Sequence, residues 1–351
     1  MNYSLSFKTT ALSLDEKIAR LSLAVQRGQG CLLSFLIHSL FESEAEAHCG
    51  LLDPQQTFTV AMLRQFVRHF TAEGYRFLSP RDLQRHLCPQ GKYVLLTFDD
   101  GYYNNLRALP VLEEFAVPAV FFISTDHVRY GKAFWWDALY RESRKRGCPA
   151  EEVRRMLEAY KRMNTAQIES AINARLGKAA LCPVSDLDRP FTAAELKKFS
   201  AHPLVFLGNH TRDHAILTNY SSAGLREQIW SCQEAIREIS GKRPEIIAYP
   251  NGNCSSEILA AAREAGLQFG LLANPGRNHL PFKSASDAAL ALRRFTLWGD
   301  RPVEAQCLAS RSPLSIARFF QGLRHRHQAV FSQLLPARTG REKAFARSAG
   351  S

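Results

Sequence analysis

The 351-residue sequence contains no long hydrophobic run, no C-x-x-C pair and no internal repeat. Because no stretch reaches about 18 consecutive apolar residues, we expect no transmembrane helix. The N-terminal segment lacks a basic region followed by an apolar core, so no secretory signal is expected. The eight cysteines lie far apart, which is typical of reduced thiols. These absences predict a cytoplasmic protein and leave peripheral membrane association open.

The composition is that of a soluble globular protein, with 46% hydrophobic and 22% charged residues. A chain of this length holds one large α/β domain or two smaller ones. The formal net charge of +12 is concentrated at the C-terminal end, where residues 311–351 carry eight Lys or Arg and one acid, Glu342. Nothing in this segment resembles a zinc finger or an aromatic-interleaved surface for reading bases, so we expect no nucleic-acid partner.

Apolar segments alternate with helical patterns along most of the chain. Helices are predicted at 13–25, 59–73, 110–117, 222–239 and 255–265. Continuous apolar runs, typical of buried parallel strands, occur in the segments 31–38, 93–98, 119–124, 204–210, 245–252, 269–273 and 293–298. With about seven such strands, an α/β fold built as a closed or nearly closed parallel barrel is favoured over an open sheet.

One region interrupts this alternation. Residues 129–200 are largely helical and are predicted to form an insertion over the body. We therefore divide the chain into an N-terminal helical extension (1–30), a barrel (31–300) and a basic helical tail (301–351). Apolar residues at helical spacing in the tail predict a basic amphipathic helix that either contacts an anionic membrane or docks on the barrel: Ile316, Phe319, Phe320, Leu323, Val330 and Leu334.

Polar residues follow the ends of several predicted strands. His38 ends the first strand, Asp99 and Asp100 follow the second, His210 follows "LVFLGN", and the segment 250–252 follows "EIIAY". Parallel strands gather their C-terminal ends on one face, where active sites of such folds lie. We therefore expect these residues to share one pocket. Asn104 and Asn105, by contrast, are expected on the surface.

"HTRDH" places His210 and His214 four residues apart, a spacing that brings two imidazoles to one metal from one helical turn. A solvated pair of loop histidines is the alternative. Two imidazoles and one carboxylate from Asp99 or Asp100 form a three-ligand site suited to Zn²⁺ or another divalent ion. The second aspartate then remains ionised as a base, which metal-assisted hydrolysis requires. A simple Asp-Gly turn is the competing explanation for this pair.

Three motifs resemble the polysaccharide deacetylase (NodB-homology) family in order and spacing: "TFDDG" at 97–101, "HTRDH" at 210–214 and "AYPNG" at 248–252. The likeness extends over residues 31–300. The resemblance implies a distorted (β/α)7-like barrel and metal-dependent removal of N-acetyl groups from a sugar.

By position, the resemblance makes Asp99 the catalytic base and Asp100, His210 and His214 the ligands of a divalent metal, with Zn²⁺ favoured. The backbone N–H of Asn251 would help to hold the oxyanion. Tyr249 and Pro250 of "AYPNG" are expected to line the substrate site. The implied substrate is an N-acetylated glycan or a lipid-linked sugar.

Two features depart from the family pattern. The arginine that often precedes the third motif is absent, and Arg294 in "LRRFTLW" is the proposed substitute. The usual late strand that ends in the general-acid histidine is also absent. "CLLSFLIH" stands first in the chain instead, which resembles the subgroup of exopolysaccharide deacetylases with this strand permuted to the N-terminus. His38 is therefore the candidate acid, and His279 is the second choice.

Other readings remain open. Trp135 and Trp136 of "AFWWD" form either a sugar-stacking platform or part of the insertion's packing. A phosphohydrolase would use the aspartates of "TFDDG" but would leave "HTRDH" unexplained. A catalytically inactive deacetylase fold that binds glycan or aids assembly is the main alternative, because the motif arginine is missing.

Overall fold

The structure, a computed structural model, describes residues 17–19, 21, 23, 30–53 and 57–313. In this part of the chain, seven parallel strands pair in the order β7-β6-β5-β4-β3-β1-β9. Leu271 of β7 also pairs with Leu292, just before β9, so the two ends of the sheet approach each other. The predicted nearly closed barrel is confirmed. Its strands are β1 (Cys31–Ile37), β3 (Lys92–Phe98), β4 (Ala119–Ile123), β5 (Val205–Asn209), β6 (Ile246–Ala248), β7 (Phe269–Leu271) and β9 (Arg294–Thr296).

Alternation along each strand divides its side chains between the barrel interior and the helical shell. Leu95 of β3 packs with Val120 and Phe122 of β4 in the interior cluster. Leu96 and Phe98, at the alternate positions, belong to the cluster that the outer helices cover. Both faces are therefore apolar, which is why these strands appear as continuous hydrophobic runs in the sequence.

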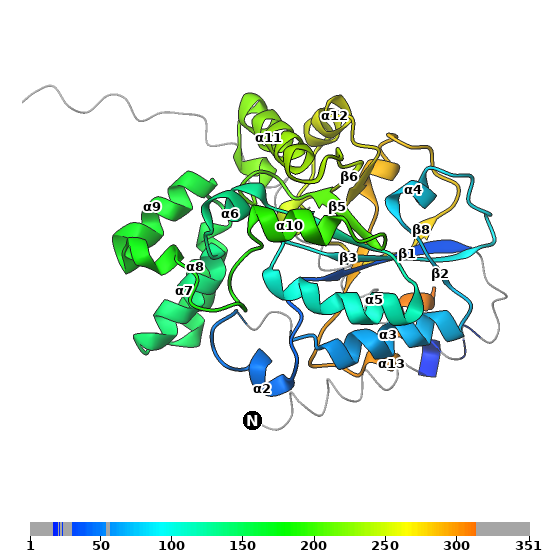
Figure 1. The fold of residues 1–351 in the computed structure, drawn as a ribbon, viewed down its shortest axis with the longest axis horizontal. Coiled ribbons are helices and arrows are strands. Elements are labelled where there is room, and N and C mark those ends of the chain that lie inside the picture. Colours follow the sequence, from blue (N-terminus) through cyan, green and yellow to red (C-terminus); the bar gives the residue numbers. More distant parts are fainter. Residues whose placement is uncertain (1–16, 20, 22, 24–29, 54–56, 314–351) are drawn as a thin grey trace, which may run out of the picture.

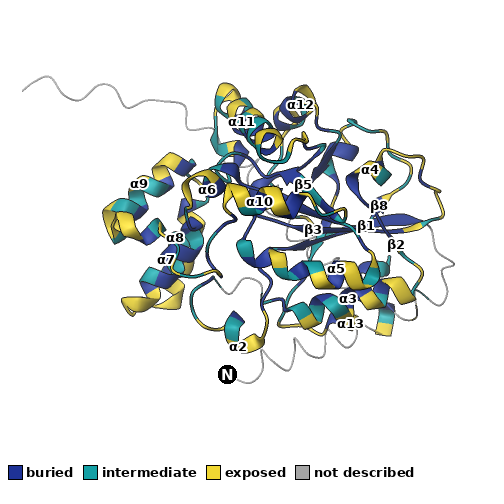
Figure 2. Ribbon diagram, viewed as in Figure 1, coloured by how far each residue is buried: buried dark blue, intermediate teal, exposed yellow. Residues whose placement is uncertain are grey.

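Helices cover the outside of the barrel, and Figure 2 shows buried strands surrounded by helices with exposed outer faces. α3 begins after the N-cap Thr59, whose side chain accepts a hydrogen bond from the Met62 N–H, and it buries Phe66 and Phe70. The shell comprises α3 (Val60–Ala72), α5 (Leu109–Phe115), α10 (Ala193–Ser200), α11 (Ser222–Ser240), α12 (Ser256–Glu264) and α13 (Val303–Arg311).

Three helices, α7 (Trp135–Lys145), α8 (Ala150–Tyr160) and α9 (Thr165–Leu176), form a cluster beside the barrel, away from α3, α5 and α13 (Figure 1). They share a small core of their own that includes Trp135, Leu139 and Ile172. The preceding short helix α6 (Thr125–Tyr130) follows directly from β4. The chain between β4 and β5 therefore leaves the barrel, builds a helical layer and returns through α10.

The sequence did not predict the shortest elements. They are α2 (Glu44–Ala47), β2 (Arg76–Phe77), α4 (Pro80–Leu83) and β8 (Asn278–His279). Elements of two to four residues are too short to show a period of 2 or 3.6. β8 pairs antiparallel with β1, with His279 opposite Cys31 at the beginning of that strand.

Residues 17–19, 21 and 23 are helical, which agrees with the helix predicted at 13–25, and its other residues lie outside the described ranges. The tail's predicted helix at 316–334 also lies outside them, whereas α13 covers 303–311. The predicted domain boundaries at residues 30 and 300 stay predictions. Among the described helices, none is both long and apolar enough to cross a membrane.

Candidate active site

The end of β3 directs two neighbouring carboxylates to different partners. Thr97 near the end of β3 and Asp99 just after it are two residues apart, so both side chains face the barrel interior. Asp100 and Gly101 then adopt left-handed backbone conformations, with φ of 75° and 88°. The Gly101 N–H donates to the Asp99 carbonyl at 3.0 Å, which closes a tight turn. The Asp-Gly turn is therefore present, and the same turn directs the two neighbouring carboxylates to different partners.

Asp99 is paired with Arg294. Its two oxygens accept hydrogen bonds from Nη1 and Nη2 of Arg294 at 2.7 and 2.9 Å. The guanidinium also donates to Thr97 Oγ1 at 3.0 Å and to the Leu272 carbonyl at 2.9 Å. Both side chains are buried, with 3% of Asp99 and 1% of Arg294 exposed. Because both Asp99 oxygens are occupied by Arg294, this carboxylate is poorly placed to bind a metal as well.

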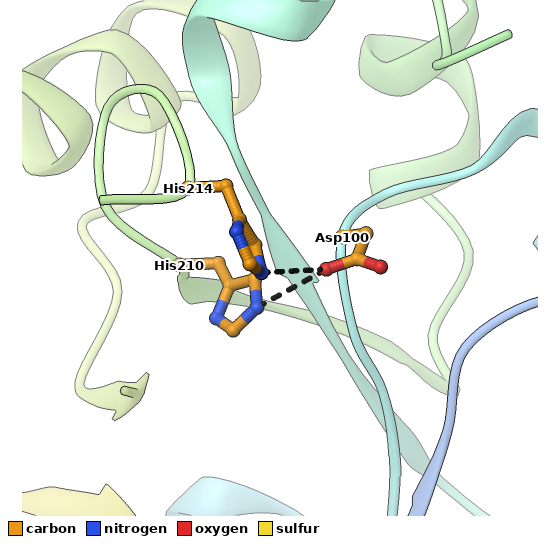
Figure 3. A group of neighbouring side chains, drawn as sticks. All are labelled: Asp100, His210 and His214. Carbon is orange, nitrogen blue, oxygen red and sulfur yellow. Dashed lines mark ion pairs between the residues drawn. The ribbon is translucent and has the colours of Figure 1, made fainter. Parts of the chain in front are cut away.

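Asp100, His210 and His214, which we call the metal triad, converge from two strand ends (Figure 3). Oδ1 of Asp100 lies 3.2 Å from Nε2 of His210 and 3.3 Å from Nε2 of His214. The candidate ligand atoms of the three side chains lie within 4.8 Å of one another. Two further contacts with the triad are longer: Oδ2 of Asp99 is 3.9 Å from Nε2 of His210, and Nε2 of His38 is 4.0 Å from Oδ2 of Asp100.

The two histidines flank a turn, and the prediction of a helical turn was wrong. Thr211 and His214 have φ of 63° and 56°, which a right-handed helix does not allow. The turn is closed by the Asn209 side chain, which accepts from the Thr211 N–H at 2.9 Å, and by Thr211 Oγ1, which accepts from the Ala215 N–H at 2.7 Å. Nδ1 of His210 contacts the Ala248 carbonyl at 2.7 Å. As the donor there, Nδ1 leaves the Nε2 lone pair directed at Asp100.

The metal triad fits a divalent cation. Both Asp100 oxygens are buried and have no hydrogen-bond partner among the described residues. Buried carboxylate oxygens without partners are costly, and a cation is the natural compensation. Two imidazoles and a carboxylate form a known ligand set for catalytic Zn²⁺. The contact between His210 and a backbone carbonyl is the kind of outer hydrogen bond that orients metal-binding histidines.

The pKa values of the triad reflect burial and mutual charge. Burial tends to raise the pKa of Asp100, but the neighbouring histidines, His38 first, lower it below its usual value. Burial lowers the pKa of His214 to about 3. Burial also lowers the pKa of His210, but Asp99 and Asp100 outweigh it and raise the value above the ordinary one. An ionised Asp100 and a neutral His214 are the forms that bind metal.

Asp99 is also held ionised. Burial alone would raise the pKa of its carboxyl, but the charge of Arg294, followed by that of His210, lowers the pKa below its ordinary value. This is the condition that a base near neutral pH must meet, because only the carboxylate accepts a proton.

Strained backbone is concentrated at this face of the barrel. Six non-glycine residues of the described chain have positive φ, and four of them are Asp100, Thr211, His214 and Asn251. Each such residue costs on the order of 1–3 kcal/mol and persists only where its surroundings impose it. The same three motif loops therefore carry both the chemistry and the strain, which is typical of a functional site.

A cavity of about 220 Å³ opens above the metal triad. Arg294, His38 and Asn251 line it. His38 follows β1 and is 32% exposed at its side chain. Asn251 is exposed and has a left-handed backbone. His279 lies at the opposite end of β1 from His38, so the second choice for the acid was wrong: seven strand residues span roughly 20 Å.

The predicted substrate-binding residues differ in how far their side chains are accessible from the cavity. Trp136 and Trp135 line the cavity, but Trp135 is only 6% exposed and packs in the core of the insertion, so its face is not open for stacking. Tyr249 also lines the cavity, yet its hydroxyl donates to the Leu290 carbonyl at 3.0 Å. Pro250 is buried and does not belong to the lining. The roles assigned to these four residues stay predictions.

The sequence analysis missed several residues of this site. Asn104 and Asn105 are buried, contrary to the expectation of a surface position, and Asn105 donates to the His38 carbonyl at 2.7 Å. Tyr102 and Asp137 also line the cavity and are 2% and 1% exposed. The sequence feature that could have identified Tyr102 and Asp137 is their position directly after "DDG" and "WW", respectively. A second cavity of about 640 Å³ between α7 and α8 shares three lining residues with the first: Asp53, Leu157 and Lys161.

Known structures share this fold. The Streptococcus pyogenes deacetylase PplD in complex with acetate superposes with a TM-score of 0.56 at 18% identity, covering 81% of this chain and 99% of that one. IcaB from Ammonifex degensii gives a TM-score of 0.51 at 16% identity, covering 81% and 98%. At 16–18% sequence identity, these superpositions show a shared fold and no more.

The sequence comparisons identify the family. YxkH of Bacillus subtilis, whose name provisionally assigns it to the polysaccharide deacetylases, is 24% identical over 208 residues. The match covers 58% of this chain and 54% of YxkH, so it spans about half the length of that relative. The family described as polysaccharide deacetylase matches residues 86–270, more than half of the 351 residues. This chain therefore belongs to the polysaccharide deacetylase family.

Proposed function

We propose that this protein is a metal-dependent hydrolase that removes N-acetyl groups from an amino sugar. The substrate is a glycan or lipid-linked glycan precursor of bacterial exopolysaccharide or cell-surface polysaccharide. The observation that carries the proposal is the division between the two aspartates: Asp99 is bound to Arg294, and Asp100 faces two histidines. The second cavity beside the first supports a substrate larger than one sugar.

In this mechanism, Asp100, His210 and His214 would hold the divalent ion, with Zn²⁺ favoured. Such an ion would activate a water and polarise the acetamide carbonyl. Asp99 accepts the proton of the attacking water, and Arg294 keeps this carboxylate ionised and oriented. The backbone N–H of Asn251 would hold the developing oxyanion. His38 gives a proton to the nitrogen as the C–N bond breaks, which releases acetate and a free amine.

The inactive alternative depended mainly on the missing motif arginine. Arg294 comes from a different strand, but its guanidinium contacts both oxygens of Asp99. This contact removes the main reason for favouring an inactive protein. The metal triad, which the phosphohydrolase reading leaves unexplained, likewise favours the deacetylase.

The direct test combines metal analysis with assays of N-acetylated oligosaccharides. We expect equal amounts of acetate and new free amine, lost after chelation and restored by Zn²⁺ or another divalent ion. Glycan binding with full metal content but no acetate would instead support the inactive binding protein. Phosphate release from a phosphomonoester would support the phosphohydrolase.

The Asp99–Arg294 pair predicts a shift in the pH profile. Arg294→Gln removes the charge that lowers the pKa of Asp99, so this pKa should rise. Since the base acts ionised, the acidic limb of kcat/KM should move to higher pH. Arg294→Lys keeps the charge and should move the limb less. Breaking a buried ion pair costs about 3–5 kcal/mol, so folding should be verified first. An unchanged limb in both folded variants would contradict the role of Arg294.

A further inference from the structure

The two histidines of the metal triad are held differently. Nδ1 of His210 contacts the Ala248 carbonyl at 2.7 Å. Nδ1 of His214, in contrast, is buried without a hydrogen-bond partner among the described residues. A metal-binding histidine is normally oriented by a hydrogen bond from its second nitrogen. Another contact must therefore fix the ring of His214.

Trp136 provides that contact. Its ring lies 4.5 Å from the ring of His214, centroid to centroid, at an interplanar angle of 58°. Phe134 stacks on the same indole at 5.0 Å and 23°. Trp136 stands at the beginning of α7, so a side chain of the insertion packs directly against a candidate metal ligand.

Hydrogen bonds hold this indole in place. Nε1 of Trp136 donates to the Tyr102 hydroxyl at 3.0 Å, and that hydroxyl donates to Oδ2 of Asp137 at 2.6 Å. Oδ1 of Asp137 accepts from the Asp53 N–H at 2.8 Å. We call Trp136, Tyr102 and Asp137 the indole tether. Tyr102 lies two residues after Asp100, so the tether joins the loops of two triad members.

Simple docking of the insertion does not explain the tether. Asp137 is 1% exposed, and among the described residues its two oxygens accept from the Tyr102 hydroxyl and the Asp53 N–H, neither of which is a cation. Burial raises its pKa well above the ordinary value. A buried carboxyl without a cation is destabilising, and an apolar residue would dock α7 at lower cost. Asp137 instead fixes an orientation: its carboxylate accepts from the Tyr102 hydroxyl, and this hydroxyl accepts from the indole N–H.

We propose that Trp136 is the positioning residue of His214, and that Tyr102 and Asp137 hold its indole in the required orientation. The inference rests on the proposed metal centre. It assigns the helical insertion a part in building that centre, because α7 supplies for His214 the constraint that the Ala248 carbonyl supplies for His210.

The test measures metal binding by the full chain without substrate. Tyr102→Phe removes a single oxygen atom, keeps the ring and touches no ligand. Trp136→Leu removes the ring. Both should weaken Zn²⁺ binding, measured by competition with a chelator, by about 10–100-fold. The visible spectrum of the Co²⁺-loaded protein should change in both, because the coordination geometry changes.

Leu139→Ala is the matched control. Leu139 lies on the same helix, is 0% exposed and packs in the core of the insertion, which Trp136 borders, but it takes no part in the hydrogen bonds of the tether. It should lower the unfolding temperature but leave Zn²⁺ affinity and the Co²⁺ spectrum unchanged. Unchanged affinity in Tyr102→Phe and Trp136→Leu, or an equal loss in Leu139→Ala, would overturn the inference alone. Failure of the unaltered protein to bind Zn²⁺ would overturn the metal centre and the inference together.

Discussion

Asp100→Asn should abolish metal binding and turnover together, whereas Asp99→Asn should keep the metal and lose turnover by roughly 100-fold or more. The reason is the division of contacts. Both oxygens of Asp99 are hydrogen-bonded to Arg294, whereas those of Asp100 have no hydrogen-bond partner among the described residues, and its Oδ1 faces His210 and His214. Metal content measured beside acetate release from an N-acetylated oligosaccharide distinguishes the two variants.

The control for this experiment is another buried ion pair. Arg141 donates to Asp188 at 2.5 Å, and their side chains are 2% and 0% exposed. Neither residue lines the cavity. Asp188→Asn therefore disturbs a comparable buried pair, and it should destabilise the fold without changing metal content or turnover per folded molecule. Equal metal retention in Asp99→Asn and Asp100→Asn would show that the two roles are assigned wrongly.

The polar residues at the strand ends could be predicted because the two patterns that reveal them are local in the sequence. An apolar run predicts a buried strand, and the next polar residue lies on the face where parallel strands end. His38, Asp99 and His210 were placed in one pocket by this reasoning, and all three line the cavity. Arg294 begins a short strand and reaches Asp99, 195 residues away in sequence. The family resemblance raised it as a candidate, but only the barrel's closure brings the two together.

The tether illustrates what sequence patterns cannot supply. Tyr102 and Asp137 are separated by 35 residues, and their contact depends on how the insertion returns over the barrel. The insertion was predicted as helical, yet nothing in "AFWWD" distinguished a stacking platform from packing. The same limit explains the error for His210 and His214, since a spacing of four suits both a helical turn and the observed loop with left-handed residues.

His38→Ala should keep its metal but slow the cleavage of N-acetyl sugars by roughly 100-fold. The amine is a poor leaving group unless it is protonated as the C–N bond breaks, and an imidazole exchanges protons near neutral pH. β1 pairs with β3 in a register that joins Ile37 to Phe98, so His38 lies beside Asp99 at the strand ends. Asn105 donates to the His38 carbonyl and anchors it there.

An activated acetate ester separates an acid from a structural histidine, because its leaving group departs without a proton. His38→Ala should therefore act on the ester at a rate much closer to that of the unaltered protein than it does on the sugar. His279→Ala is the matched control: His279 is exposed and pairs at the opposite end of β1, so both rates should stay unchanged. Equal losses on ester and sugar in His38→Ala would mean that His38 supports the site without donating the proton. The acid would then have to be sought among the other residues that line the cavity.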